Sequence, residues 1–328
     1  MDPQELSKAA YALYPHLSAS DGGETGEALA KRIESLKKGL MPEDEFAATA
    51  MWLGNCAAIH HIDQTPMPLQ VGRDEMRAPD FLAFPIVNGQ PRPVLIEVKA
   101  VDEMAVDWSD KYLKSLRTFA ELLNLPLLVA WKWRDLWTLV DHHHFEKNVT
   151  AHRLTSEKAL KEDLMCALFR DLRVMMNPEV ELIFDMEILD EISGDAGDLI
   201  PAGMLGMKIV NAGFYRNGEK MTDEFGLMLF LAAPEDEEFR RTGKQTCQQV
   251  FRPLRDSSFT LSRVLIAQLS LGAKDGELNW HQILAKGEFP SKGSDVRDSL
   301  RAGLDHDFVR YVMDTVPHEW PDFLPART

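Results

Sequence analysis

Two apolar runs separated by a short turn constrain the fold of this chain more than any other feature. The stretch Ala78–Ala100 reads APDFLAFPIVNGQPRPVLIEVKA, and the turn between its runs is rich in Pro, Gly and Asn. Such runs on either side of a turn predict two neighbouring strands, Phe81–Val87 and Val94–Lys99. The charged residues within these otherwise apolar strands are Asp80, Glu97 and Lys99.

Side chains of a strand alternate between its two faces, so Glu97 and Lys99 point to the same face. A carboxylate and an ammonium on a strand of buried character are costly unless each has a partner. Asp80 begins the preceding strand, and pairing of the two strands brings its carboxylate near Glu97. Adjacent carboxylates repel each other, and a divalent cation removes that repulsion. Hard oxygen ligands in a partly open site favour Mg²⁺.

Elements on either side extend the strand pair into an α/β unit. A helix is expected from Pro42, because Pro suits a first helical turn and acids follow it. A short strand follows in CAAIHHIDQTP. Beyond the strand pair come an acidic loop, a helix in SDKYLKSLRTFAELLNL capped by Ser109 or Asp110, and strands in PLLVAWKW and WTLVD. From residue 40 to 141 the order is helix, three strands, helix, strand, strand, on a mixed sheet.

In this context Pro79-Asp80 and Glu97-Val98-Lys99 resemble the motif of the PD-(D/E)XK nuclease superfamily, which includes restriction endonucleases and archaeal Holliday-junction resolvases. The resemblance covers residues 40 to 141, about a third of the chain. It implies a restriction-endonuclease-like αβββαβ core with a mixed central sheet. The alternative for the three charges is a surface ladder of cross-strand ion pairs on an ordinary sheet.

The resemblance also implies roles for these residues. Asp80 and Glu97 would hold a divalent ion, Mg²⁺ or Mn²⁺, with the Val98 carbonyl as a further ligand. Lys99 would position or activate the attacking water and stabilise charge on the phosphate. Hydrolysis would be in-line and would leave a 5′-phosphate and a 3′-hydroxyl.

Many members of the superfamily add an acid from the helix before the first strand. Glu43 and Glu45 compete for that role here, and both also suit a helix N-terminus without any ligand. Glu43 is preferred because it shares a helix face with Phe46, Ala47 and Ala50, which directs it toward the sheet.

Charge restricts how the chain meets a polyanion. The formal net charge is -16, which excludes a bulk electrostatic coat on nucleic acid and leaves local basic surfaces. Two such surfaces are candidates for phosphate contact. One lies on the helix after the strand pair, at Lys111, Lys114 and Arg117. The other lies between Arg240 and Arg263 and includes Arg252 and Arg255, and its alternative role is to balance the acids of PEDEEF in a solvated loop.

The rest of the chain is expected to form a second, smaller α+β domain. The predicted organisation is a helical lead-in over 1–40, a nuclease-like domain over 41–150 and an α+β domain over 151–328, with a winged helix as one option. The α+β domain would contain a helix in EKALKEDLMCALFRDLRVMM, strands in VELIFDMEIL, MKIVNAGFY and FGLMLFLAAP, and a helical end.

Other conspicuous residues have ordinary interpretations. His142, His143 and His144 are expected in an exposed loop, because adjacent residues rarely converge on one ion. Trp131, Trp133 and Trp137 are expected to pack the sheet and its helix. Three separated cysteines indicate a reducing compartment. With no signal peptide and no apolar segment near the roughly 20 residues of a membrane helix, the prediction is a cytoplasmic protein.

The sequence therefore predicts a metal-dependent DNA endonuclease, a Mg²⁺-dependent phosphodiesterase, with a defence or mobile-element role by analogy. Two alternatives stay open. The fold can serve as a binding or scaffolding module with little catalysis, or the same site can cleave RNA. A homodimer is a further option that the sequence does not decide.

Overall fold

The computed structural model describes residues 42–63, 76–149, 151–191, 205–221, 226–233, 235–272, 280–287, 289 and 291–326. The expected helical lead-in of residues 1–40 lies outside these ranges. The chain forms two compact units, of which unit 1 comprises Met1–Arg170, Glu277–Phe289 and Thr315–Thr328, and unit 2 comprises Asp171–Gly276 and Pro290–Asp314. Unit 1 thus takes in more of the chain than the expected domain of residues 41–150. No helix of the described ranges is long and apolar enough to cross a membrane.

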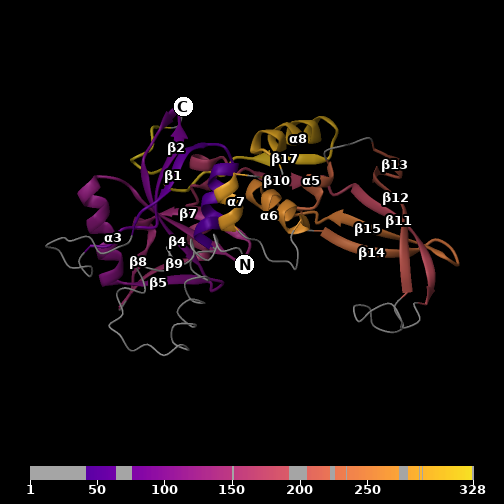
Figure 1. Ribbon diagram of the computed structural model, residues 1–328, viewed down its shortest axis with the longest axis horizontal. Helices are drawn as coiled ribbons and strands as arrows, with labels where there is room; N and C mark the ends of the chain where they lie inside the picture. The colour runs from indigo at the N-terminus through magenta and orange to yellow at the C-terminus, as the bar shows by residue number, and fades with distance from the viewer. Residues whose placement is uncertain are drawn as a thin grey trace. The chain divides into compact units, whose positions relative to one another are not determined.

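A mixed central sheet forms the core of unit 1 (Figure 1). Its strand order is β1-β2-β4-β6-β7, and only the β4–β6 pair is parallel in this row. The strands are β1 (Cys56–His61), β2 (Phe81–Val87), β4 (Val94–Ala100), β6 (Leu127–Trp133) and β7 (Leu136–Asp141), with the two-residue β3 (Gln90–Pro91) paired to β2. The strands that the sequence predicts in this region are therefore present.

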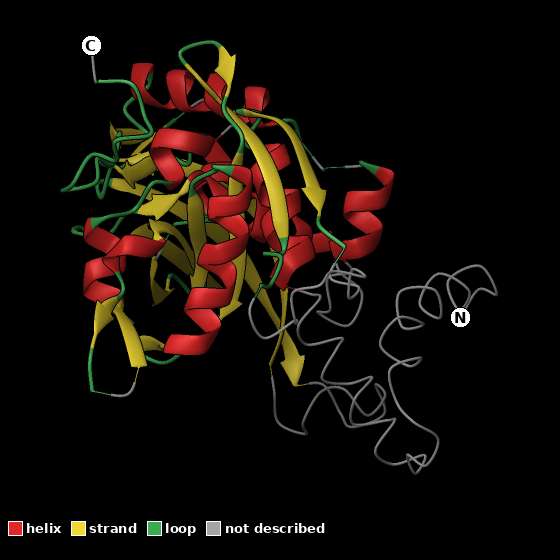
Figure 2. Ribbon diagram, turned by 90° about the vertical axis from the view of Figure 1, so that its left-hand side faces the viewer, coloured by secondary structure: helices red, strands yellow, loops and turns green. Residues whose placement is uncertain are grey.

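Helices cover both faces of this sheet (Figure 2). Residues 42–52 form one helix, whose Phe46 ring contacts the rings of Phe81 and Trp137. The other helix, α3 (Asp110–Leu123), begins where the Ser109 hydroxyl accepts a hydrogen bond from the Tyr112 N–H. Its apolar stripe packs in one core with Leu95, Leu127, Val129 and Trp131. Because Leu95 and Ile96 point to opposite faces of β4, the sheet is buried on both sides.

Two expectations in the rest of unit 1 are wrong. The expected acidic loop and polar boundary instead contribute a small sheet in the order β5 (Ala105–Ser109), β9 (Ala151–Thr155), β8 (Glu146–Lys147). The long helix expected after it is broken. Helix α4 (Ser156–Lys161) ends early, a helical turn follows at Met165–Phe169, and residues Arg173–Met176 form strand β10 of unit 2. Pairing of β10 with two distant strands overrides its helical pattern.

Unit 2 contains a long antiparallel sheet in the order β13-β12-β11-β15-β14. The strands are β11 (Val180–Glu191), β12 (Leu205–Arg216), β13 (Glu219–Lys220), β14 (Glu235–Arg241) and β15 (Thr246–Pro253). The expected Asn217-Gly218 turn joins β12 to β13, and both residues have positive φ. The strand expected in FGLMLFLAAP is wrong, because Gly226–Phe230 form helix α5, whose Phe230 packs on Phe214.

The remaining elements follow the expected helical end in part. Helices α6 (Leu261–Gly272) and α8 (Gly293–Asp305) belong to unit 2, and α7 (Trp280–Lys286) belongs to unit 1. A second small sheet of unit 2 has the order β16 (Phe259–Thr260), β10, β17 (Val309–Met313).

A buried ion pair ties the 42–52 helix to the sheet. Lys132 Nζ of β6 lies 2.6 Å from Glu45 Oε2, and the other Glu45 oxygen accepts a hydrogen bond of 3.1 Å from the Trp137 indole N–H. Glu45 is only 5% exposed. Both oxygens are thus satisfied inside the core, which is the condition under which a buried carboxylate is tolerated.

We expect Lys132→Met to lower the free energy of unfolding of unit 1 by about 3 kcal/mol, because it leaves the Glu45 carboxylate buried without its cation. Glu45→Gln combined with Lys132→Met should recover most of that loss, since an amide still accepts from Trp137. All seven tryptophans lie in unit 1, so tryptophan fluorescence during urea unfolding reports this unit. Lys161→Met, which removes an exposed ion pair with Glu157, should leave the curve almost unchanged. A single variant as stable as the double variant would contradict the prediction.

Candidate active site

The register between β2 and β4 brings two acids together. Phe81 pairs with Ile96, so the next position of the same antiparallel register places Asp80 opposite Glu97. Residues opposite each other in such a pair share a face of the sheet. Asp80 Oδ2 accepts a hydrogen bond of 2.7 Å from the Val98 N–H, which fixes its carboxylate against β4. Asp80 is 5% exposed and Glu97 is 1% exposed.

The two oxygens of Glu97 have different surroundings. Oε1 lies 2.6 Å from Lys99 Nζ and also accepts a hydrogen bond from the Tyr112 hydroxyl of α3. Oε2 is buried and has no hydrogen-bond partner among the described residues. A buried carboxylate oxygen without a donor is costly, and it is a position where a cation would be stabilised.

Glu43 stands beside this pair of acids. Burial, followed by the charges of Asp80 and Glu97, raises the pKa of the Glu43 carboxyl to about 8. Its rival Glu45 has both oxygens occupied by Lys132 and Trp137. The charges of Asp80 and Glu97 therefore act on Glu43, whereas Glu45 is paired with Lys132.

These residues match the chemistry of a hard divalent cation. Three carboxylates supply oxygen donors, and one of the oxygens, Glu97 Oε2, is orphaned. In the described part of the chain, however, the groups with three potential ligand atoms within 4.8 Å of one another lie at the histidines after β7, and none includes these acids. Val98 contributes its N–H to Asp80, and the role of its carbonyl stays a prediction.

Lys99 keeps its charge at this site. Burial alone would lower the pKa of its ammonium, but the charges of Glu97 and Asp80, with the hydrogen bond to Glu97, outweigh burial and raise the pKa above its ordinary value. Its side chain remains 30% exposed, so a ligand from solvent can reach it. Lys99 is therefore a stable cation at the rim of the acid pair and not a base.

Sequence reasoning missed Tyr112. Burial and the charge of Glu97 raise the pKa of its hydroxyl, so the group stays protonated and donates to Glu97. The guanidinium of Arg77 lies over the Tyr112 ring, with Cζ 4.9 Å from its centre. In the sequence, Tyr112 is marked only by its position next to Leu113 of the expected helical stripe. That position does not identify Glu97 as its partner.

His61 was also missed as a neighbour of the site. Its ring packs on Phe81 at 4.2 Å between centroids, while Nδ1 lies 3.8 Å from Glu43 and Nε2 lies 3.6 Å from Asp44. The strand β1 places it there, because His61 pairs with Phe81 in the sheet. Its imidazole thus lies beside Glu43 and Asp44 of the 42–52 helix.

The basic residues singled out in the sequence divide into two sets. Lys111 and Lys114 are exposed on α3, and Arg117 is half-buried with an Nε that has no partner among the described residues. In unit 2, Arg252 lies 2.6 Å from Glu181 and 2.8 Å from Glu238, which also neighbour Arg240. Arg240 and Arg252 therefore pair with acids, as expected in the alternative role. They lie on strands β14 and β15, however, and not in a solvated loop. Arg255 is exposed beyond β15.

The tryptophan expectation is confirmed for Trp131 and Trp137, which are fully buried. The expectation of an exposed loop at the three histidines is wrong for His142 and His144, while His143 is exposed. His142–His144 form a 3-10 turn in which the buried His142 Nδ1 lies 3.0 Å from the Leu127 carbonyl oxygen. Hydrogen bonds from His142 and His143 outweigh burial and lower the pKa of Asp141 to about 2.

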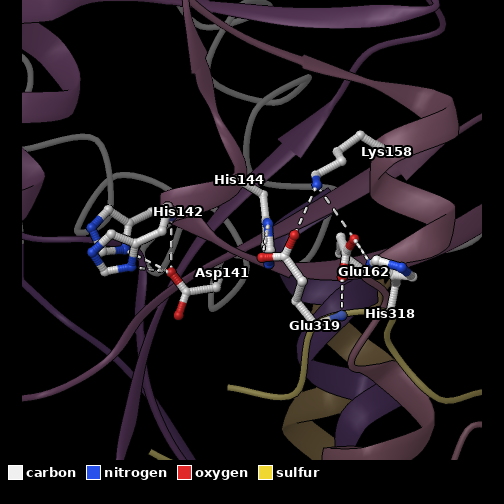
Figure 3. Close-up of polar contacts among 8 residues, drawn as sticks. Asp141, His142, His144, Lys158, Glu162, His318 and Glu319 are labelled. Atoms are coloured by element: carbon white, nitrogen blue, oxygen red, sulfur yellow. Dashed lines mark hydrogen bonds and ion pairs between the residues drawn. The ribbon is translucent and has the colours of Figure 1, made fainter. Parts of the chain in front are cut away.

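His144 belongs to a separate cluster with Glu162 and the C-terminal segment (Figure 3). Its Nδ1 lies 3.9 Å from Glu319, and Glu162 Oε2 accepts a hydrogen bond of 2.8 Å from the Glu319 N–H. Lys158 Nζ lies 3.4 Å from Glu162 and 3.6 Å from Glu319, so it supplies a cation between the carboxylates. The cluster is thus an ion-pair network that fastens the C-terminal segment to α4.

No protein-family model and no curated protein matches this chain. Among solved structures, the chain is similar to Hjc, a Holliday junction resolvase from the archaeal hyperthermophile Archaeoglobus fulgidus. The identity is 19% and the TM-score is 0.29, over 37% of this chain and 85% of that chain.

The Glu162 network predicts a pH dependence. Burial alone would raise the pKa of Glu162, but the Glu319 N–H, His144 and Lys158 outweigh it and hold the pKa below its ordinary value. A lowered folded pKa stabilises the fold above the ordinary value near 4.5, and this stability is lost as the pH falls through the folded pKa. We expect Glu162→Gln to lower the melting temperature of unit 1 at pH 7 by roughly 3–6 °C, with a smaller loss at pH 3. Tryptophan fluorescence measures both, and Glu157→Gln, at an exposed pair, is the control. An equal loss at the two pH values would contradict the prediction.

Proposed function

We propose that this protein is a metal-dependent nuclease that hydrolyses phosphodiester bonds of DNA. The observation that carries the proposal is the pairing of Asp80 with Glu97, whose Oε2 is buried without a partner, beside the ammonium of Lys99. The order of helix 42–52, β1, β2, β4, α3 and β6 supports an αβββαβ core of the PD-(D/E)XK kind. The exposed bases of α3 support a nucleic acid as substrate.

Each residue has a defined task in this proposal. Asp80, Glu97 and Glu43 would hold Mg²⁺ or Mn²⁺, which supplies when bound a positive charge for the scissile phosphate and a more acidic water. Lys99 donates hydrogen bonds to the attacking water and to a phosphate oxygen, because its charge is stable and partly exposed. Tyr112 fixes the orientation of Glu97. Water attacks phosphorus in line, the bond from phosphorus to the 3′-oxygen breaks, and that oxygen takes up a proton.

A scaffolding role is the second class of function, and the intact set of acids and lysine opposes it. Unit 2 is then the part that binds DNA, a second copy or another partner. RNA as the substrate uses the same site. A panel of linear, nicked, branched and single-stranded DNA, with RNA alongside, distinguishes these substrates by rate.

Incubation with plasmid and Mg²⁺ or Mn²⁺ tests the activity. We expect Lys99→Ala and Asp80→Asn to lower the rate of nicking by about 100-fold or more, since each removes charge stabilisation or a ligand. Lys161→Ala is the matched control, because it removes a lysine from an exposed pair on α4. Equal nicking by the wild type and the two site variants would remove the assignment.

Metal binding can be tested without activity. In the metal-free protein at pH 7 we expect Glu43→Gln to raise the stability of unit 1 by on the order of 1 kcal/mol or more, because burial and the charges of Asp80 and Glu97 oblige Glu43 to take up a proton on folding and an amide needs none. The same variant should lose most of the stabilisation that Mn²⁺ gives the wild type. Melting curves with EDTA and with Mn²⁺ measure both effects. A Mn²⁺ stabilisation that is the same in Glu43→Gln and the wild type would exclude Glu43 as a ligand.

A further inference from the structure

Arg77 lies close to the candidate active site but takes no part in its acid network. It precedes Asp80 by three positions, and its backbone N–H donates a hydrogen bond of 3.1 Å to the Ser115 carbonyl of α3. Its guanidinium lies over the Tyr112 ring, with Cζ 4.9 Å from the centre. The Nε atom is buried and has no hydrogen-bond partner among the described residues. Backbone and ring thus hold the side chain in place while a donor is left unused.

This arginine contrasts with others of the chain. The chain has 52 acidic residues against 36 Lys and Arg, and several of its arginines are paired with acids. Examples are Arg153 with Asp107 and Arg252 with Glu181. In the described ranges, Arg77 has no such ion pair. A partly exposed guanidinium without an ion pair in the described ranges of so acidic a protein indicates that its acceptor is an anion from outside the chain.

The surroundings of Arg77 define the kind of anion. The Tyr112 ring beneath it donates its hydroxyl to Glu97, and Lys99 Nζ lies 5.4 Å from the centre of the same ring. The cations of Arg77 and Lys99 therefore both contact the Tyr112 ring, next to Glu97. The planar fork of a guanidinium matches the oxygens of a phosphate in a bidentate manner. Arg77 and Lys99 thus both lie against the Tyr112 ring, close enough for neighbouring phosphates of one strand to meet them.

We propose that Arg77, held over Tyr112, binds a backbone phosphate of the DNA substrate that adjoins the scissile phosphate at Lys99. This inference rests on the proposed function, and it adds a positioning residue that the acid–lysine motif does not contain. Arg77 sets the register of the strand through its phosphate contact, and Tyr112 links that contact to the orientation of Glu97. No base is read at this position, so the contact is independent of sequence.

Binding of a fluorescein-labelled DNA duplex in EDTA, followed by anisotropy, tests the contact without cleavage. We expect Arg77→Ala to weaken binding by about tenfold and to reduce the slope of log K against log salt by about 1, as loss of one phosphate contact does. Arg92→Ala is the matched control. Arg92 is exposed in the turn at the other end of the β2–β4 hairpin, so the same charge change there should leave both quantities close to the wild type.

Arg77→Lys separates the contact from folding. It keeps the charge but loses the planar fork, so the salt slope should stay near that of the wild type while affinity falls in part. Tryptophan fluorescence melting checks that each variant is folded. If Arg77→Ala is unfolded, the Arg77→Lys result alone decides the test. A wild-type affinity and slope in a folded Arg77→Ala, or in Arg77→Lys an affinity equal to that of the wild type, would overturn the contact.

The cleavage assay distinguishes this failure from failure of the proposed function. With active wild-type protein, we expect Arg77→Ala to raise KM while kcat changes less than threefold, which is about the range for a binding contact outside the reacting atoms. Cleavage by the wild type with no effect of Arg77→Ala on KM would overturn the phosphate contact and leave the nuclease assignment standing. An Arg77-dependent salt slope without any cleavage would support the contact and remove the nuclease assignment.

Discussion

The antiparallel register between β2 and β4 determines which charged groups meet in this protein. Phe81 opposite Ile96 places Asp80 opposite Glu97, and alternation along β4 places Lys99 on the same face as Glu97. The Val98 N–H then holds the Asp80 carboxylate against the neighbouring strand. A shift of one residue would send Glu97 and Lys99 together to the other face of the sheet, away from Asp80. Every proposal made for unit 1 depends on this single alignment.

The two acid–lysine pairs of unit 1 show how similar chemistry can serve different ends. Glu45 is buried against Lys132 and the Trp137 indole, and both oxygens of its carboxylate are occupied. Glu97 is also buried, beside Lys99, but one of its carboxylate oxygens has no donor in the described structure. The first arrangement is complete by itself and stabilises the fold. The second is incomplete, and its incompleteness is what makes it a candidate site.

The sequence was sufficient for the part of unit 1 in which local pattern and packing agree. The apolar runs of β2, β4 and β6 and the stripe of α3 are strong periodic signals, and the strands and helix formed as expected. The pattern failed at Arg173–Met176, which reads as the end of a helix but pairs with distant strands, and at Gly226–Phe230, an apolar run that packs as a helix. In both segments tertiary contacts decided between two states that a short apolar run permits.

The candidate site shows the same division. Asp80, Glu97 and Lys99 could be named because strand alternation fixes their common face, and helix periodicity favoured Glu43 over Glu45. Tyr112 and Arg77 could not, because their contacts join residues whose distance in space is set by the docking of α3 on the sheet. His142 was misjudged because its ring meets the Leu127 carbonyl of the neighbouring strand β6, a contact that depends on the pairing of β6 with β7.

Burial of the β4 strand on both faces has a consequence for how this protein can diverge. Its even-numbered residues, such as Ile96, belong to the layer of the 42–52 helix, while Glu97 and Lys99 belong to the opposite layer. Insertions in the exposed turn after β2 leave this parity intact, so that turn can be lengthened without moving Glu97 or Lys99 to the other face. A single extra residue inside β4 would turn the side chains on one side of the insertion to the opposite face of the sheet. Such a chain would lose the ability to fold as well as the candidate site.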